Sequence, residues 1–359
     1  MKHRQIGIGK VGVVNPDGHA IGLDIGATAV RASILAPGTL EGRPSVTIHG
    51  VGRIDLPSGV VVNGVVQEPA ALTAAIKQLW SVNKFEGHNV ILGIANQQVL
   101  VRDLTVPNLD PIKRAKALPF QAKEIVALPI DQVVLDFCQL GAPDPQTNMV
   151  RGLLLATPRE PVRIATGAVA RAGLRVARVD LSAFGTLRAI GDEHLAVEAV
   201  VDLGAHLTTI VIHDHGVPKL VRTLARGGEL LTEQLADRLS VSIPEAEHIK
   251  WEAGLEGAPE VARGLLEGLR PLVAEVRTSV GYFRSTNDGA VIERISLTGG
   301  GAHLRGIAAA LSDGIGLPTR VIDPLQHVRN RHASKQTRGA ESAFIPSAVS
   351  LGLAMGAAA

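Results

Sequence analysis

The chain has 359 residues and a hydrophobic content of 46%, which is enough apolar material for two domains of ordinary size. Its net charge is only +2 and aromatic residues make up only 3% of it, so we expect no nucleic-acid partner. It has no run of about 18 apolar residues, which excludes a typical transmembrane helix. The only cysteine is Cys138, which excludes disulfides within the chain and suits a reducing cytoplasm.

Residues 22–32 are the first patterned stretch, and they predict two β-strands joined by a tight turn. Glycine at Gly26 can take positive φ at no steric cost, as such turns require. A turn of this kind points backbone N–H groups into one small space, which suits anionic oxygens. A carboxylate at its edge, Asp24, suits Mg²⁺ held largely through water. An ordinary hairpin is the alternative for this stretch alone, and we expect residues 1–20 before it to be a flexible extension.

Residues 56–149 have a different pattern, and we expect them to form a subdomain with its own strands and helices. They open on a β stretch with an Asn63-Gly64 turn signal. The strands expected over 89–94 and 99–106 are predicted to pair with each other. The predicted strands and helices of this range cover residues 56–66, 69–82, 89–94, 99–106, 112–125 and 133–140.

The hairpin pattern occurs a second time at residues 201–210, where Asp202 and Gly204 stand in the places of Asp24 and Gly26. Between the two hairpins, strands over 151–157 and 176–180 alternate with helices. Helices predominate from residue 229 to residue 282. A third element follows at residues 296–302, where a strand runs into three glycines and then a helix.

Two acidic hairpins followed by a glycine-rich turn resemble the actin-like ATPase fold of actin, sugar kinases, MreB, FtsA and PilM. Within that fold, several segments are similar to the PilM family of type IV pilus assembly proteins, so that residues 21–355 resemble this family. One departure is a proline pair that is split between Pro119 and Pro129. The segments that carry the resemblance are residues 56–64, 101–107, 117–137, 172–180, 226–232, 246–250 and 350–354.

The resemblance implies an α/β, actin-like ATPase fold, in which two ribonuclease-H-like halves surround a nucleotide cleft. An FtsA/PilM-type inserted subdomain would interrupt the first half. The implied ranges are 21–55, 150–198 and 340–359 for the first half, 56–149 for the inserted subdomain, and 199–339 for the second half, with its helical subdomain at 230–290.

The resemblance also implies a ligand, ATP or ADP with Mg²⁺. The first turn would meet the β-phosphate and the second turn the γ-phosphate, while Asp24 and Asp202 would hold Mg²⁺ largely through water. Glu247 and Lys250 would contact ribose and adenine; without the resemblance, a surface ion pair is the simpler interpretation. The full set of nucleotide-binding residues that it implies is Gly26, Ala27, Thr28, Gly204, Ala205, His206, Thr208, Gly228, Glu247, Lys250, Gly299, Gly300 and Gly301.

Hydrolysis requires a group that orients water in line with the γ-phosphate. By resemblance, Asp180 stands where MreB carries a glutamate, and it is our only candidate for this role. His206 beside the second turn is unusual, because small or hydroxyl residues are common there. We therefore expect weak or absent ATP hydrolysis.

The expected function is a cytoplasmic, ATP-binding scaffold at the inner face of the cell membrane. In PilM-like proteins, the cytoplasmic tail of the inner-membrane protein PilN binds beside the inserted subdomain. Other pilus machinery proteins and self-association are further expected contacts, and membrane contact would come only through partners. The alternatives are a filament-forming cell-division protein like FtsA and, less favoured, a sugar kinase.

Overall fold

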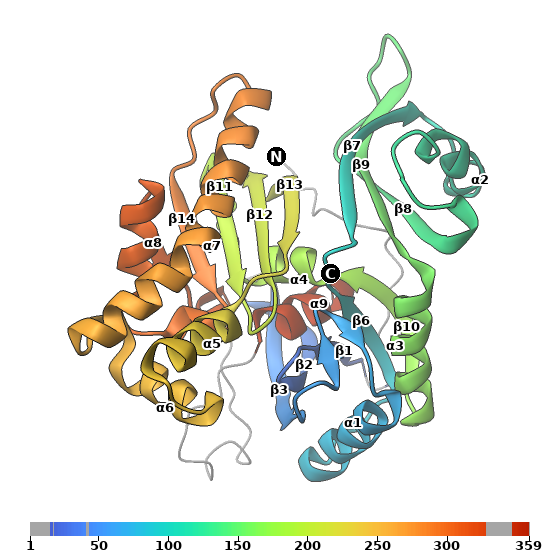
Figure 1. Ribbon diagram of the computed structural model, residues 1–359. Helices are drawn as coiled ribbons and strands as arrows, with labels where there is room; N and C mark the ends of the chain where they lie inside the picture. Colours follow the sequence, from blue (N-terminus) through green and yellow to red (C-terminus); the bar gives the residue numbers. More distant parts are fainter. Residues whose placement is uncertain (1–14, 17, 41–42, 328–346, 359) are drawn as a thin grey trace.

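Two five-stranded mixed sheets with one shared strand order form the centre of the protein (Figure 1). The computed structural model describes residues 15–16, 18–40, 43–327 and 347–358. In each sheet the first three strands pair antiparallel, and the fourth and fifth run parallel to the first. This duplication confirms the predicted two-half α/β fold. The first sheet has the order β3 (Arg43–Asp55), β2 (Ala29–Leu40), β1 (Ala20–Ile25), β6 (Asn89–Ile94) and β10 (Arg175–Leu181). The second has the order β13 (Val217–Leu224), β12 (Thr208–Asp214), β11 (Val197–Leu203), β14 (Arg294–Thr298) and β15 (Thr319–Val321).

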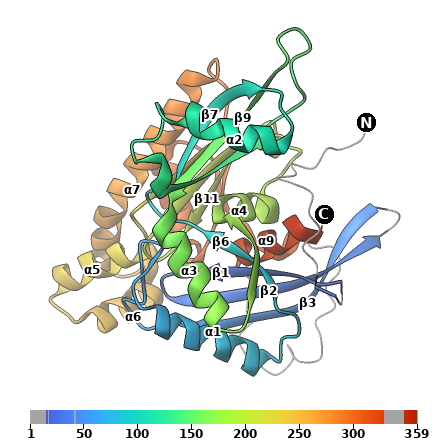
Figure 2. The ribbon, with the colours of Figure 1, turned by 90° about the vertical axis from the view of Figure 1, so that its right-hand side faces the viewer.

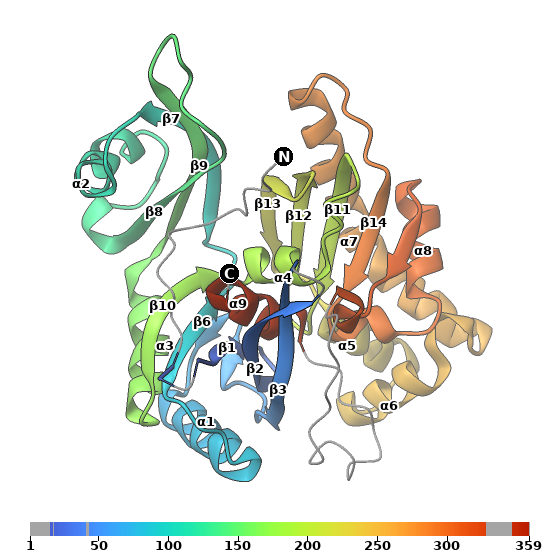
Figure 3. The ribbon, with the colours of Figure 1, turned by 180° about the vertical axis from the view of Figure 1, so that it is seen from behind.

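Helices form three layers around the two sheets, as Figures 1 and 3 show from opposite sides. The outer face of the first sheet packs on α1 (Pro69–Asn83) and α3 (Arg159–Arg171). The outer layer of the second half consists of α5 (Gly228–Leu239), α6 (Ile243–Ala253), α7 (Pro259–Thr286) and α8 (Ile307–Ile315). The inner layer, α4 (Ser182–Ile190) and α9 (Ala348–Ala358), lies between the sheets and shares one core with both.

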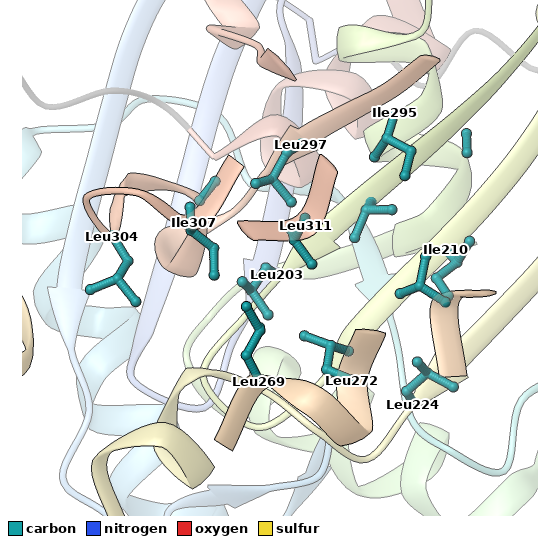
Figure 4. Close-up of a cluster of buried hydrophobic side chains, with 14 of the residues drawn as sticks. Leu203, Ile210, Leu224, Leu269, Leu272, Ile295, Leu297, Leu304, Ile307 and Leu311 are labelled. Atoms are coloured by element: carbon teal, nitrogen blue, oxygen red, sulfur yellow. The ribbon is translucent and has the colours of Figure 1, made fainter. Parts of the chain in front are cut away.

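Strand alternation explains why both faces of the second sheet are buried. Leu203 and Ile210 belong to the outer core, which is drawn in Figure 4 with leucines of α7 and α8. Val200 and Val211 belong to the inner core with α4 and α9. Strands buried on both faces are the near-continuous apolar runs that the sequence shows at residues 199–203 and 208–212.

Glycines let the two inner helices approach each other and the first sheet closely. A Cβ atom added at Gly352 of α9 would lie 1.8 Å from the carbonyl oxygen of Gly185 on α4. A Cβ at Gly22 of β1 would lie 2.0 Å from the carbonyl oxygen of Ser350 on α9. Because no other residue fits these contacts, the glycines set the distance between α4, α9 and the strand that carries Asp24.

A separate three-stranded sheet stands beside the first half, with β9 (Met149–Pro158) between β7 (Leu100–Pro107) and β8 (Val133–Gln139). Helix α2 (Pro111–Ala122) packs on it (Figure 2). We call this sheet with α2 the small subdomain. The prediction that residues 89–94 and 99–106 pair was wrong, because β6 lies between β1 and β10 in the first sheet and β7 pairs with β9.

The predicted inserted range 56–149 is therefore divided by the sheet topology. Helix α1 and strand β6 belong to the first half, and the small subdomain extends past residue 149 into β9. Sequence periodicity could not show this, since an apolar strand does not reveal its partner. The buried run of β6, in contrast to the mostly exposed β7, is the signal of a central parallel strand.

The predicted flexible extension, residues 1–20, is described only at residues 15, 16 and 18–20, which pack against the first half; residues 1–14 and 17 lie outside the described part. The Asn15 side chain accepts hydrogen bonds from the backbone N–H groups of His88 and Asn89 and donates to the carbonyl oxygen of Asn89. The short elements are β4 (Val61–Val62), β5 (Val65–Val66), η1 (Ile130–Gln132), η2 (Gly254–Glu256), η3 (Gly300–His303) and η4 (Pro324–His327). Within the described residues, no helix has both the length and the apolar character needed to cross a bilayer.

Substitution of Gly352 tests the close contact between α4 and α9. Gly352→Ala is expected to lower the free energy of unfolding by about 1–3 kcal/mol, because the added methyl group forces the helices apart. Gly281→Ala on α7 is the matched control, since its Cβ would have no atom within 4 Å, and we expect it to raise stability by about 0.5–1 kcal/mol. Urea denaturation followed by circular dichroism measures both; equal stability of the two variants would contradict this packing.

Candidate functional site

The two acidic hairpins bring Asp24 and Asp202 close to each other. Each aspartate ends the first strand of its sheet: Asp24 lies opposite Arg31 on β2, and Asp202 lies opposite Thr209 on β12. The negative charge of Asp24 raises the pKa of Asp202. The sequence repeat therefore corresponds to one shared site between the two halves.

Burial makes both carboxyl groups harder to ionise. It raises the pKa of Asp24. The Arg31 guanidinium at 3.9 Å and a 2.7 Å hydrogen bond from the Ser347 hydroxyl lower this pKa, but by less than burial raises it. Burial and then the Asp24 charge raise the pKa of Asp202 to about 6, although the Thr186 hydroxyl donates a 3.3 Å hydrogen bond to it. The two carboxylates thus form a site of excess negative charge near neutral pH.

Three side chains around this pair were not identified from the sequence. Arg31 could have been found, because a two-strand hairpin around Gly26 places it opposite Asp24. Thr186 and Ser347 come from α4 and from the residue before α9, so only the tertiary structure brings them here.

Each turn offers two N–H groups rather than the predicted three. The Gly26 N–H donates to the carbonyl of Ala29 at 3.0 Å, and the Gly204 N–H donates to the carbonyl of Leu207 at 2.9 Å. These bonds close the turns, so neither group is available to a ligand. Within the described residues, the remaining turn N–H groups make no backbone hydrogen bond; they belong to Ala27, Thr28, Ala205 and His206.

The start of α5 supports the second turn. The N–H groups of Gly228 and Glu229 donate to the carbonyl oxygens of Gly204 and Ala205 at 2.9 and 3.0 Å. Gly227 is required here, since a Cβ atom on it would lie 2.2 Å from the carbonyl oxygen of Ala205. The positive end of the α5 dipole therefore lies beside the turn, which favours an anion there.

The glycine run after β14 packs directly on Asp202. Gly299 has a φ of 89°, and a Cβ atom on it would lie 2.3 Å from Asp202 Oδ1. A Cβ on Gly301 would collide with the Leu203 side chain, whereas Gly300 is exposed and faces open space. The structure thus brings the three predicted glycines to the second turn, and Gly300 leaves room beside it.

Glu247 and Lys250 form a network on the first turns of α5. The buried Lys250 Nζ donates to Glu247 Oε2 at 2.6 Å, to the Thr232 hydroxyl at 2.7 Å and to the Gly228 carbonyl at 3.1 Å. The other Glu247 oxygen accepts a 2.7 Å hydrogen bond from the Trp251 indole. The pair is not a simple surface ion pair, because it connects α6 to the helix that supports the second turn.

His206 and Thr208 have local partners at the second turn. The Thr208 hydroxyl donates to the Arg226 carbonyl at 2.7 Å. His206 contacts Glu229 through Nε2, and its Nδ1 accepts a 3.4 Å hydrogen bond from the Asn63 N–H. Asn63 lies in the β4–β5 turn of the first half, so His206 connects the two halves beside the carboxylate pair.

Asp180 is placed differently from the two turn aspartates. Its carboxylate pairs with Arg188 at 2.6 Å and accepts a 2.8 Å hydrogen bond from the Leu181 N–H. Its charge also raises the pKa of Cys138 on β8, so it lies on the side of the small subdomain. Within the described residues, no group of three or more histidine, cysteine or acidic side chains could hold a metal ion by itself.

Comparison with known proteins places these features in a family. A family model described as type IV pilus assembly protein PilM matches residues 22–358. A solved structure titled "PilM-PilN type IV pilus biogenesis complex" has 28% sequence identity and a TM-score of 0.79, covering 95% of this chain and 98% of that chain.

More distant similarities extend to related groups. The cell division protein FtsA of Neisseria meningitidis serogroup B is 28% identical over 266 residues, which cover 65% of this chain and 61% of FtsA. The chain thus spans about three fifths of that relative. An ethanolamine utilization protein EutJ from Carboxydothermus hydrogenoformans shares the fold, with a TM-score of 0.54 and 18% identity over 96% of this chain and 92% of that chain. The family match and the fold together show that this chain, with its predicted actin-like architecture, belongs to the PilM family of type IV pilus assembly proteins.

Proposed function

We propose that this protein is an ATP-binding scaffold of the type IV pilus assembly machinery, with the nucleotide phosphates bound between its two acidic turns. The observation that carries this proposal is the shared site itself: two coupled carboxylates and the N–H groups of two turns, contributed by opposite halves. Phosphate oxygens would accept from the N–H groups of Ala27, Thr28, Ala205 and His206. The α5 N-terminus would add positive potential beside the second turn.

The electrostatics of the carboxylate pair fit a hydrated Mg²⁺ ion. Asp24 and Asp202 share one nearby cation, Arg31, which lowers the pKa of both without offsetting burial. A divalent cation would neutralise both carboxylates and the phosphates together. Its coordination would be completed by water and phosphate oxygens, because the chain offers two carboxylates rather than a full cage.

The nucleoside would lie toward Gly300 and the α5–α6 network. Gly300 is the open glycine of the run, and Lys250 and Glu247 lie beside Gly228 at the start of α5. The charged network fixes the angle between α5 and α6, and Glu247 keeps an exposed part of its side chain toward solvent. This placement supports the predicted ribose and adenine contacts.

Hydrolysis would be weak. The only predicted water-positioning residue, Asp180, is already paired with Arg188 and accepts a hydrogen bond from the Leu181 N–H. At the second turn, His206 already has partners in Asn63 and Glu229. Both side chains thus already have partners and are not free to orient a water molecule, so the bound nucleotide would act as a structural ligand between the halves.

The partner would be the cytoplasmic tail of a PilN-like membrane protein, as the matching solved complex suggests. β10 pairs only with β6 among the described residues, so one of its edges is free, and Val179 on it is 40% exposed. Arg178 on β10 acts electrostatically on Cys138 of β8, so the small subdomain flanks this edge. An extended tail could add there as a further strand, which would recruit the protein to the inner face of the cell membrane.

Replacement of Asp202 tests two effects of its carboxylate, which should lower the stability of the ligand-free protein and strengthen nucleotide binding. Asp202→Asn is expected to raise the stability of the ligand-free protein at pH 7.5 by about 1–3 kcal/mol, because the raised pKa makes the ionised form unfavourable when folded. Since the folded-state pKa is raised, the wild type should lose this stability as pH rises from about 4 to about 6. The variant should show a smaller change, because only the raised pKa of Asp24 then contributes to it; urea denaturation across this pH range measures the difference.

The same variant should bind Mg·ATP at least tenfold more weakly in calorimetry, because a charge-assisted contact is lost. Asp237→Asn on the exposed surface of α5 is the matched control and should change neither stability nor binding. A variant that binds Mg·ATP as well as the wild type would remove Asp202 from the proposed site.

ATP turnover by the purified protein should be slow. Steady-state phosphate release is expected well below the ~1–100 s⁻¹ typical of kinases, since Asp180 is already paired with Arg188. Asp202→Asn protein prepared in parallel measures contaminating ATPase activity. Turnover within the kinase range that is lost in the variant would show an efficient ATPase rather than a scaffold.

The free edge of β10 should determine tail binding. Val179→Glu is expected to weaken binding of a synthetic PilN-like tail peptide at least tenfold in fluorescence anisotropy, because it places a charge on the docking edge. Val291→Glu, at a 72% exposed valine of the second half, is the control and should bind like the wild type. If Val179→Glu leaves the affinity unchanged, the tail binds elsewhere.

A further inference from the structure

Four arginines recur every seven residues along the exposed side of α7, the longest described helix. They are Arg263, Arg270, Arg277 and Arg284. Each residue of an α-helix turns by about 100°, so a seven-residue step returns to within about 20° of the same direction. Over the three steps from Arg263 to Arg284 the direction drifts by about 60°, so the four side chains follow a line that winds slowly around the helix, with about 10.5 Å between neighbours along the axis. We call this line the arginine stripe.

The arginines of the stripe have no partners of their own. All four side chains are exposed, and the structure gives them no ion pair or hydrogen bond within the described residues. Glu267, which lies four residues after Arg263 and three before Arg270, is already paired with Arg238 at 2.7 Å. Other arginines of this half do have partners: Arg226 pairs with Glu275 and Arg294 with Glu198. The stripe is thus set apart by its regular spacing, which places four unused cations along one helix.

The surface between the arginines carries Glu267 and, beside it, three apolar residues. On the same side of the helix lie Leu266, Ala274 and Gly281, all exposed. A Cβ atom added at Gly281 would meet nothing within 4 Å. The two small residues, Ala274 and Gly281, would let another chain approach the backbone of α7 closely.

The opposite side of α7 is fixed in the core of the second half, so the stripe is rigid. Leu265, Leu269 and Phe283 are at most 2% exposed and pack in the core cluster that Figure 4 shows. Because the backbone does not have to be ordered on binding, a partner would lose little of its binding energy to the conformational entropy of this helix.

We propose that the arginine stripe of α7 docks an acidic α-helix of a protein partner whose carboxylates recur every seven residues. A guanidinium group binds a carboxylate through two parallel hydrogen bonds, which makes arginine the preferred cation at protein interfaces. Two helices that cross at a shallow angle stay in contact over several turns when both have a seven-residue repeat. The regular spacing therefore favours a helical partner, and the unpaired charges require an acidic one.

An anionic lipid surface fits the stripe less well. Helices that lie on membranes combine cations with several large apolar side chains on one face. Leu266, 44% exposed, is the only large apolar side chain within the stripe. The seven-residue spacing of the arginines would also bring no advantage in binding a fluid lipid surface.

The direct test uses two labelled, helical 28-residue peptides of identical composition. In one, glutamates recur every seven residues; in the other, they are redistributed so that the period is lost. Fluorescence anisotropy with the full-length protein should show at least tenfold tighter binding of the periodic peptide. The Arg270→Glu/Arg277→Glu variant should bind the periodic peptide at least tenfold more weakly. The Arg270→Lys/Arg277→Lys variant keeps the positive charges but cannot form the paired hydrogen bonds of a guanidinium group, and its affinity should fall about threefold or more.

A charge-matched control places the effect on α7. Arg171→Glu/Arg320→Glu changes two exposed arginines outside the stripe and should keep wild-type affinity within about twofold. Circular dichroism confirms folding, because all substituted side chains are exposed. The proposal would be overturned if the protein bound both peptides with equal affinity, or if the control variant lost as much affinity as the stripe variant. It would also be overturned, in favour of a lipid surface, if the protein bound phosphatidylglycerol vesicles but not the periodic peptide.

Discussion

The structure depends on the placement of two carboxylates, Asp24 and Asp202, at the point where the two halves meet. Each is partly buried, and the charge of the first makes ionisation of the second unfavourable. One guanidinium group, from Arg31, is not sufficient to offset this. Perturbed pKa values of this kind gather at functional sites, and this is why we propose that the carboxylates, the four available N–H groups and the start of α5 act together as a site for a metal-bound phosphate.

The inner helices are what hold these groups in place. α4 and α9 lie between the two sheets and touch through glycines. The Thr186 hydroxyl of α4 donates a hydrogen bond to Asp202, and the hydroxyl of Ser347, the residue before α9, donates one to Asp24. A change in the distance between the sheets would therefore alter both carboxylates. The Asn63–His206 contact adds a second connection on the same side. The nucleotide binding that we propose would therefore be coupled to the relative position of the halves through these few residues.

Much of the fold, and the residues at the centre of the candidate site, could be predicted from the sequence, because both correspond to short local sequence patterns. The two acidic hairpins and the glycine run each have a local pattern and a turn residue that can be recognised without knowing which distant strand they pair with. What failed was pairing over distance: β6 proved to be a central strand of the first sheet, so the range 56–149 was not one subdomain. Likewise, nothing local shows that Asp180 pairs with Arg188 or that Gly26 and Gly204 use their N–H groups to close the turns.

The most direct test of the shared site follows the backbone amide signals of the two turns by nuclear magnetic resonance while a Mg²⁺ complex of a non-hydrolysable ATP analogue is added. The account predicts that the amides of Ala27 and Thr28 shift together with those of Ala205 and His206 and saturate at one ligand concentration. Amides of the arginine stripe on α7 should not move. Shifts confined to one turn, or separate saturation of the two turns, would contradict a single phosphate site between the halves.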